Sequence, residues 1–132
     1  MNSSLSSPDI VTSAFIIIGN EILSGRTKDV NLNYLAAELV DAGIQLEEVR
    51  VIQDNHDVIA NTIQALKTKY DYVFTSGGIG PTHDDITCDS VAQSFGLGVQ
   101  HHPEALERMK AHAEKRGVEL NEARLRMART PV

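Results

Sequence analysis

The sequence predicts an α/β fold, a three-layer α/β/α sandwich with a mainly parallel sheet. Short runs rich in β-branched and aromatic residues alternate with stretches whose apolar residues recur at helical spacing. Glycines and carboxylates follow directly after these runs. In a parallel sheet the carboxyl ends of the strands share one edge, and ligands bind there. The pattern therefore predicts a ligand site at that edge.

The first half of the chain predicts two strands separated by a loop and a helix. Residues 14–18 are an unbroken apolar run, typical of a strand buried on both faces. Residues 20–28 are polar, and we expect a loop there. Apolar residues at helical spacing predict a helix from residue 29 to Gly43, where a left-handed residue can end it. Alternation over residues 44–52 predicts the second strand.

The second half predicts a third strand over residues 72–75 and four helices. The first helix follows Asp54 and Asn55, either of which can cap it. The other helices are predicted over residues 86–95, 103–117 and 119–128.

We expect residues 1–12 to form a flexible tail and residues 13–132 to form one domain. A chain of 132 residues can bury one hydrophobic core. The C-terminal third has no predicted strand. Either the sheet is small, or further strands belong to a longer chain, and we expect the domain to be incomplete at its C-terminus.

The charge balance argues against nucleic acid or an anionic membrane surface as a partner. The net charge is −6, from 12 Lys and Arg against 18 Asp and Glu. Basic residues within 108–116 and 124–129 alternate with acidic or small apolar residues, and we interpret both groups as solvated helix faces. The only cysteine, Cys88, excludes an internal disulfide and suits a cytoplasmic location. We expect the Cys88 side chain to be buried where its helix packs against the rest of the protein.

The loop after the third predicted strand combines glycines with hydroxyl side chains. Glycines there allow a sharp turn and leave backbone N–H groups uncovered, which suits a phosphate. The spacing matches neither the Walker A loop nor the dinucleotide-binding glycine motif, so a plain tight turn is the alternative. The candidate phosphate-binding residues are Ser76, Gly77, Gly78, Gly80, Pro81 and Thr82.

Carboxylates beside such a turn would repel a phosphate unless they hold a cation or transfer protons. Asp84 and Asp85 follow the turn, Asp89 lies one helical turn later, and Asp54 follows the second strand. Oxygen ligands of this kind suit Mg²⁺ bridging phosphate oxygens. The alternative for Asp54 and for one of the adjacent pair is helix capping. We expect Thr87 to cap the helix after the loop.

Polar residues also surround the exit of the first predicted strand. Their position at the same edge makes them ligand-binding candidates, although loop residues of this type are commonly exposed turn formers. They are Asn20, Glu21, Ser24, Asp29 and Asn31.

With these residues identified, the chain resembles the molybdopterin-binding domain family, and most closely its competence/damage-inducible branch. Residues 19–31, GNEILSGRTKDVN, are similar to the family's G-[ND]-E-[IL]-L-x-G-x-x-x-D-x-N block. Asp54 falls on its V-x-D block. Residues 76–87, SGGIGPTHDDIT, resemble T-G-G-[LI]-G-P-T-x-D-D-x-T, with Ser76 in place of threonine.

The resemblance implies a MogA/MoaB-like α/β domain that forms a dimer or trimer. In the molybdenum-cofactor branch, pterin phosphate and adenylate bind at the glycine loop, and two aspartates support Mg²⁺-dependent adenylyl transfer. Those aspartates fall here on Asp54 and Asp85. The competence/damage-inducible branch is associated with metal-dependent hydrolysis of ADP-ribose and related pyrophosphates. A related domain forms the N-terminal part of eukaryotic FAD synthases.

Four functions therefore remain open. The first is hydrolysis of a nucleotide pyrophosphate with a divalent metal, and the second is adenylyl transfer to molybdopterin. The third is binding of a nucleotide or pterin without turnover. The fourth is a fold retained mainly for assembly. Retention of both aspartates and all three glycines favours catalysis.

Overall fold

The structure is a computed structural model that describes residues 9–132. Residues 1–8, most of the predicted tail, lie outside the described residues. Among the residues that are described, no helix is long and apolar enough to cross a membrane.

The main sheet has three parallel strands in the order β2-β1-β3. The central strand β1 (Val11–Ile18) is flanked by β2 (Ile44–Ile52) and β3 (Tyr72–Ser76). Burial of β1 explains its unbroken apolar sequence, since residues 13–18 are buried whichever face of the sheet they point to. The parallel α/β prediction is confirmed. The first strand starts at Val11 instead of residue 14, inside the stretch expected to be tail.

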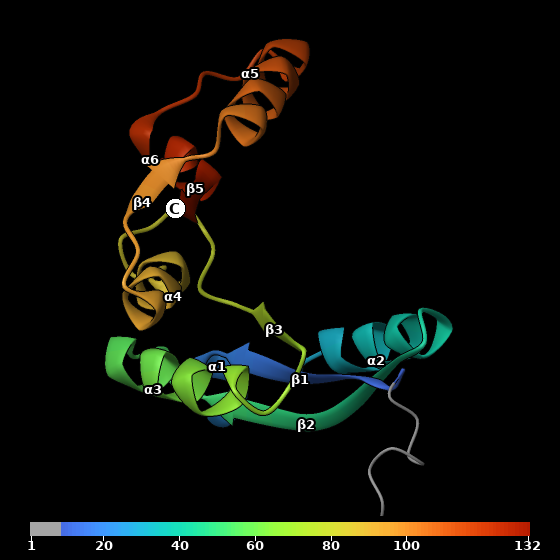
Figure 1. The fold of residues 1–132 in the computed structure, drawn as a ribbon. Helices are drawn as coiled ribbons and strands as arrows, with labels where there is room; N and C mark the ends of the chain where they lie inside the picture. The colour runs from blue at the N-terminus through green and yellow to red at the C-terminus, as the bar shows by residue number, and fades with distance from the viewer. Residues whose placement is uncertain (1–8) are drawn as a thin grey trace, which may run out of the picture.

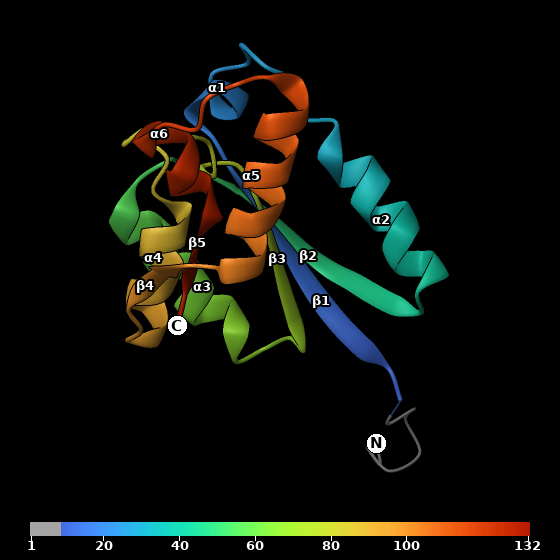
Figure 2. The same ribbon diagram turned by 90° about the horizontal axis from the view of Figure 1, so that it is seen from above.

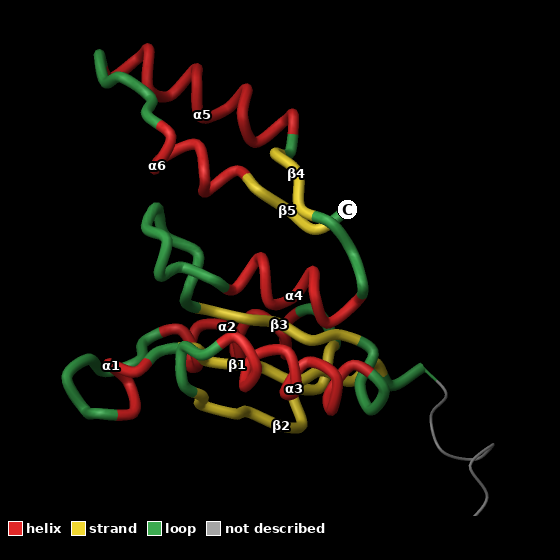
Figure 3. Tube along the Cα trace, turned by 90° about the vertical axis from the view of Figure 1, so that its left-hand side faces the viewer, coloured by secondary structure: helices red, strands yellow, loops and turns green. Residues whose placement is uncertain are grey.

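Helices cover both faces of this sheet, which makes three layers. In Figures 2 and 3, α2 (Asn31–Asp41) lies on one side of the strands and α3 (His56–Lys67) on the other. Right-handed crossovers require this arrangement, because the chain moves from β1 to β2 in one direction and returns past β1 to reach β3.

The hydrophobic core lies between β1 and α3. The side chains of Ala14, Ile16 and Ile18 on one face of β1 pack with three buried residues of α3, namely Ile59, Ile63 and Leu66. Asn55 caps α3, because its side-chain oxygen accepts a hydrogen bond from the Val58 N–H at 3.1 Å. Asp54 is therefore free of the capping role that the sequence left open.

The chain beyond β3 forms a helix and a small projecting unit. α4 (Thr87–Phe95) packs against α3, and Figure 1 shows the following elements extending away from the sheet beyond it. The predicted helix from Pro103 is present as α5 (Pro103–Arg116), with His102 as its N-cap. The remaining elements are β4 (Val99–His101), α6 (Glu122–Leu125), the 3-10 helix η1 (Arg126–Ala128) and β5 (Arg129–Pro131).

Two predictions for this unit and one for the first loop were wrong. Of the helix predicted over residues 119–128, only residues 122–125 are α-helical, and residues 126–128 form the tighter turn η1. The helix ends there because residues 129–131 pair with β4 in an antiparallel ladder. β4 was missed because a three-residue strand is too short to show periodicity. In the loop predicted over residues 20–28, residues 20–23 form the one-turn helix α1 (Asn20–Leu23).

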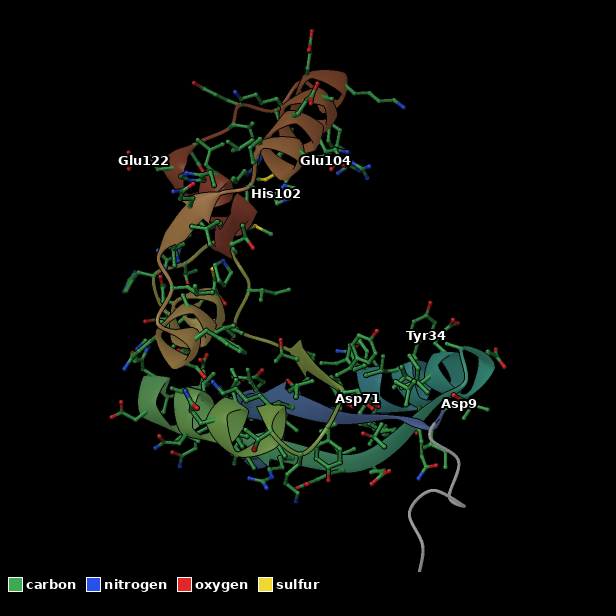
Figure 4. The ribbon with its side chains drawn as sticks, viewed as in Figure 1. Asp9, Tyr34, Asp71, His102, Glu104 and Glu122 are labelled. Atoms are coloured by element: carbon green, nitrogen blue, oxygen red, sulfur yellow. The ribbon has the colours of Figure 1, made fainter. Side chains whose placement is uncertain are left out.

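Polar contacts fix the strands at the edge opposite the carboxyl ends. Asp71 precedes β3 (Figure 4), and its carboxylate accepts hydrogen bonds from the Thr12 N–H at 2.9 Å and the Thr12 hydroxyl at 3.2 Å. On β2, Glu48 accepts a hydrogen bond from the Tyr70 hydroxyl at 2.7 Å and pairs with Arg50 at 2.7 Å. The Tyr70 hydrogen bond and then the Arg50 contact lower the pKa of Glu48 to about 2.

The Glu48 carboxylate is expected to stabilise the fold in a pH-dependent way. Its pKa falls from 4.5 to about 2 on folding, so its contribution is complete above pH 4.5 and disappears as the pH falls through about 2. Glu48→Gln should therefore lower the free energy of unfolding at pH 7, with a deficit that shrinks steadily below pH 4.5. Urea titrations across this range measure the difference. Glu47→Gln, which changes an exposed residue of the same strand, is the matched control.

Candidate functional site

The exits of all three parallel strands meet at one edge of the sheet. Ile18 pairs with Ile52, and Ile17 pairs with Ser76, so the chain leaves β1, β2 and β3 at nearly the same level. Gly19 N–H donates to the Ile52 carbonyl at 3.0 Å, which joins the first two exits. Figure 3 shows α1 and the β3–α4 loop on this same side of the sheet.

The turn after β3 requires glycine at its first two positions. Gly77 and Gly78 have φ of 92° and 67°, in the left-handed region that favours glycine. A Cβ at Gly77 would overlap the carbonyl oxygen of Ile18, and one at Gly78 would overlap the Thr87 hydroxyl. The turn therefore passes directly over the end of β1.

Thr87 fastens this turn to α4 and does not cap the helix as predicted. Its hydroxyl donates to the Gly77 carbonyl at 2.8 Å, and its N–H donates to the Gly78 carbonyl at 3.1 Å. The hydroxyl points back to the turn because Thr87 is the first residue of α4, and the N-cap position falls on Ile86. Half-exposed Ser76, Gly77, Gly78 and Gly80 thus line a fixed, accessible bend.

Asp85 braces the second part of the loop. Its Oδ2 accepts hydrogen bonds from the backbone N–H and the hydroxyl of Thr82, each at 2.9 Å. Burial acts to raise the pKa of Asp85, but the hydrogen bonds from Thr82 and Gly80 and the charge of Arg126 outweigh it, so the pKa lies below its ordinary value. The neighbouring Asp84 side chain is 87% exposed and lies 3.6 Å from the His83 ring.

The Asp54 carboxylate has a buried oxygen without a hydrogen-bond donor among the described residues. Within residues 9–132 its Oδ1 is buried and accepts no hydrogen bond. Burial raises its pKa, and the negative charges of Asp85, Glu21 and Asp84 raise it further. An isolated buried oxygen among three other acidic groups is unfavourable without a cation or a proton.

These carboxylates fit a hard divalent cation that also binds the ligand. No group of three or more His, Cys, Asp or Glu side chains able to hold a metal is found among residues 9–132. Mg²⁺ needs no such cage, because it is commonly held by one or two carboxylates together with substrate phosphates and water. The bare oxygen of Asp54, within the electrostatic influence of Asp85, is compatible with that mode. Asp89 differs, because its carboxylate already pairs with Arg129 at 2.8 Å and Arg126 at 3.4 Å.

Of the ligand-binding candidates predicted around the end of β1, some line a cavity and others hold neighbouring backbone segments in place. A cavity of about 200 Å³ is lined by Glu21, Asp29 and Asn31 together with Ser76 and Gly77 from the turn. Asp29 also accepts a hydrogen bond from the Leu32 N–H at 2.9 Å, which fixes the start of α2.

Two of these residues do not line that cavity. Asn20 Oδ1 accepts a hydrogen bond from the Asp54 N–H at 3.1 Å, so it holds the backbone of Asp54. The exposed Ser24 hydroxyl donates to the Glu21 carbonyl at 3.3 Å.

The other side of the loop faces residues that the sequence did not single out. A cavity of about 260 Å³ is lined by Gly78, Gly80 and Asp85 from the loop and by Arg126 and Arg129 from the C-terminal segment. Pro81, Thr82 and Asp84 line a wider cleft of about 820 Å³ against the same two arginines. The candidate residues therefore flank the loop on both sides instead of converging in one pocket.

The interpretation of residues 124–129 as a solvated helix face was wrong for Arg126 and Arg129. Their side chains are only 25% and 20% exposed, and they bind the loop and α4. The arginines turn inward because α6 ends before Arg126, where η1 begins, and β5 begins at Arg129. Their burial has no local sequence signal, since their carbonyl and carboxylate partners lie some forty positions earlier.

A protein family matches nearly the whole described chain. The family described as "Probable molybdopterin binding domain" matches residues 14–131. The chain belongs to the molybdopterin-binding domain family. The blocks that carry the resemblance in the sequence coincide with the exits of β1, β2 and β3 in the structure.

Relatives in this family are longer proteins. A protein of Aeropyrum pernix is 39% identical over 116 residues, covering 88% of this chain and 43% of its own length. A "CinA-like protein" of Chloroherpeton thalassium is 38% identical, covering 80% of this chain and 25% of its own. A "Probable FAD synthase" of Caenorhabditis elegans is 42% identical, covering 67% and 17%. This chain thus spans less than half of each.

Solved structures share the fold. The protein CinA from Thermoplasma acidophilum superimposes with a TM-score of 0.78 at 32% identity, covering 92% of this chain and 71% of that one. The molybdopterin biosynthesis enzyme MoaB from a Thermus species has a TM-score of 0.56 at 17% identity, covering 90% and 70%. The second likeness concerns the fold alone.

Because the turn lies so close to β1, replacing Gly77 with alanine should lower the free energy of unfolding more than replacing Gly43 does. Gly43→Ala, at a φ of 76° with nothing within 4 Å of the added Cβ, should lose only the left-handed penalty of about 1–2 kcal/mol. Gly77→Ala must also displace the Ile18 carbonyl, which should cost roughly 1–3 kcal/mol more. Denaturant unfolding of both variants measures the difference, and equal losses would show that the turn does not press on β1.

Proposed function

We propose that this domain binds a phosphorylated nucleotide or pterin at the Gly77–Gly80 turn and hydrolyses a nucleotide pyrophosphate such as ADP-ribose. The proposal includes a divalent metal, with Mg²⁺ as the expected ion, held by Asp54 and Asp85. The observation that supports it most is the buried Asp54 Oδ1, which has no hydrogen-bond partner within the described chain and is subject to the negative charges of Asp85, Glu21 and Asp84.

Each residue has a role that follows from its surroundings. Asp54 offers a bare oxygen to a cation, and Asn20 fixes the backbone of Asp54. Asp85 keeps its negative charge at neutral pH because its pKa is lowered, and it also holds the loop closed. The turn presents a half-exposed backbone to the phosphate. When bound, the metal would supply positive charge to the phosphate oxygens and favour attack by water.

A serine–histidine pair joins α3 and α4, but its position does not suit a nucleophile. Ser90 Oγ lies 2.9 Å from His56 Nδ1, but Ser90 is completely buried between α3 and α4. A side chain that no substrate can reach cannot act as a nucleophile, so this pair joins two helices.

Adenylyl transfer to molybdopterin is the second candidate, favoured by the family that matches residues 14–131. It would use the same turn and the same aspartates, with the pterin phosphate in place of water. A fold kept only for assembly would leave the uncompensated Asp54 without purpose, whereas binding without turnover is separated from hydrolysis by the release of AMP. As in the family resemblance, we include a cytoplasmic homodimer or homotrimer in the proposal, and light scattering on the purified protein tests the assembly.

Asp54→Asn is expected to abolish turnover while stabilising the metal-free protein. AMP release from ADP-ribose with Mg²⁺ should fall by at least about 100-fold, because the variant loses several kcal/mol of charge stabilisation. Stability should rise because the folded-state pKa lies above 3.8, so the ionised side chain disfavours folding at neutral pH. This gain should vanish as the pH falls below 3.8, where both states are protonated.

The matched control is Asp57→Asn, an exposed carboxylate in the first turn of α3. It should leave turnover and the response of the melting temperature to Mg²⁺ unchanged. If wild type releases no AMP but forms adenylated molybdopterin from ATP, the second candidate replaces the first. Unchanged turnover in Asp54→Asn would remove this residue from the mechanism.

A further inference from the structure

Two arginines of the C-terminal segment lie against the glycine loop and α4. Arg126 Nε donates to the Thr82 carbonyl at 2.9 Å, and its Nη2 donates to the Asp85 carbonyl at 3.1 Å. In a chain of net charge −6, Arg126 and Arg129 concentrate two positive charges next to the glycine loop. Asp85, one of the two proposed metal ligands, lines the same cavity as these guanidinium groups.

Arg129 carries a donor that the chain does not satisfy. Its Nη2 donates to Asp89 at 2.8 Å, which fixes the side chain against α4. Its Nε is buried, and no atom of the described residues accepts its hydrogen. An unsatisfied buried N–H of a charged group is costly unless an acceptor from outside completes it.

Arg129 also lines a cavity with room for a phosphoryl group. The cavity of about 260 Å³ is bounded by Gly78, Gly80, Asp85, Arg126 and Arg129. A water molecule occupies about 30 Å³ of liquid, so the cavity has room for a tetrahedral anion. Arginine is the side chain best matched to phosphate oxygens, because its planar N–H groups bind in pairs.

We propose that Arg126 and Arg129, together with the Gly78–Gly80 bend, form a second phosphate subsite that holds the distal phosphate of a pyrophosphate-linked nucleotide. The subsite rests on the proposed function only in that a first phosphate binds on the Asp54 side of the same turn. It makes diphosphates preferred ligands over monophosphates, and it makes Arg129 the residue that sets this preference.

The test compares binding of ADP and AMP by titration calorimetry with Mg²⁺ present. Wild-type protein should bind ADP at least about tenfold more tightly than AMP, the effect of one good charge-assisted contact. Arg129→Gln should reduce this ratio to near one while leaving AMP affinity unchanged. The matched control is Arg124→Gln, which removes the same charge from an exposed position of α6 and should keep the wild-type ratio.

Two further measurements test the subsite even if Arg129→Gln does not fold. Arg129→Lys retains the charge that pairs with Asp89, so it should fold normally even if Arg129→Gln does not, and it should still lose part of the ADP preference. Cys88 lines the same cavity and is the only cysteine, so ADP should slow its alkylation more than AMP does.

The outcomes separate this proposal from the hydrolytic one. An Arg129-dependent preference for ADP without any AMP release from ADP-ribose would support the subsite and contradict the hydrolysis. Turnover in wild type with equal affinities for ADP and AMP would support the hydrolysis and contradict the subsite. Binding of neither nucleotide, or equal losses of both in Arg129→Gln, would overturn the subsite.

Discussion

The site depends on one close approach between backbone segments. The turn at Gly77 passes over the carbonyl oxygen of Ile18, where no side chain fits, and Thr87 fastens it there from α4. Because β1 is the buried central strand, its end is a rigid support for the turn. The loop that carries Asp85 therefore has a fixed position relative to Asp54, although the two residues are thirty-one positions apart.

The chain leaves a polar group without a partner on each side of this loop. On one side the Asp54 carboxylate oxygen has no donor, and on the other the Arg129 Nε has no acceptor among residues 9–132. Folded proteins satisfy nearly all buried polar groups. Three such atoms lack a partner among residues 9–132, and besides Ser94 Oγ in α4 they are these two charged groups, which suit ligands of opposite charge. A cation and a phosphate anion would complete both, and a metal-bound diphosphate carries both. The family membership of the chain agrees with a phosphorylated ligand but does not specify it.

The sequence predicted the parts of the fold whose signals are local. Continuous burial of β1, alternation in β2 and helical spacing in α2, α3 and α5 are all readable from neighbouring residues, and their bounds agree closely with the structure. β4, η1 and β5 were not predicted, because three-residue elements depend on partners distant in the chain. The glycines and Asp54 were singled out from their position directly after predicted strands, whereas Arg126 and Arg129 were mistaken for surface residues because their partners lie far away in the chain.

The most direct test of the central claim is the pKa of the Asp54 side chain, measured by carboxyl carbon NMR with and without Mg²⁺ and AMP. The account predicts a value above 3.8 in the free protein, because burial and the neighbouring carboxylates disfavour the charge. On addition of Mg²⁺ with AMP the value should fall below 3.8, because the cation then favours the ionised form. An ordinary value that neither addition changes would contradict the claim that this carboxylate is held in place for a metal.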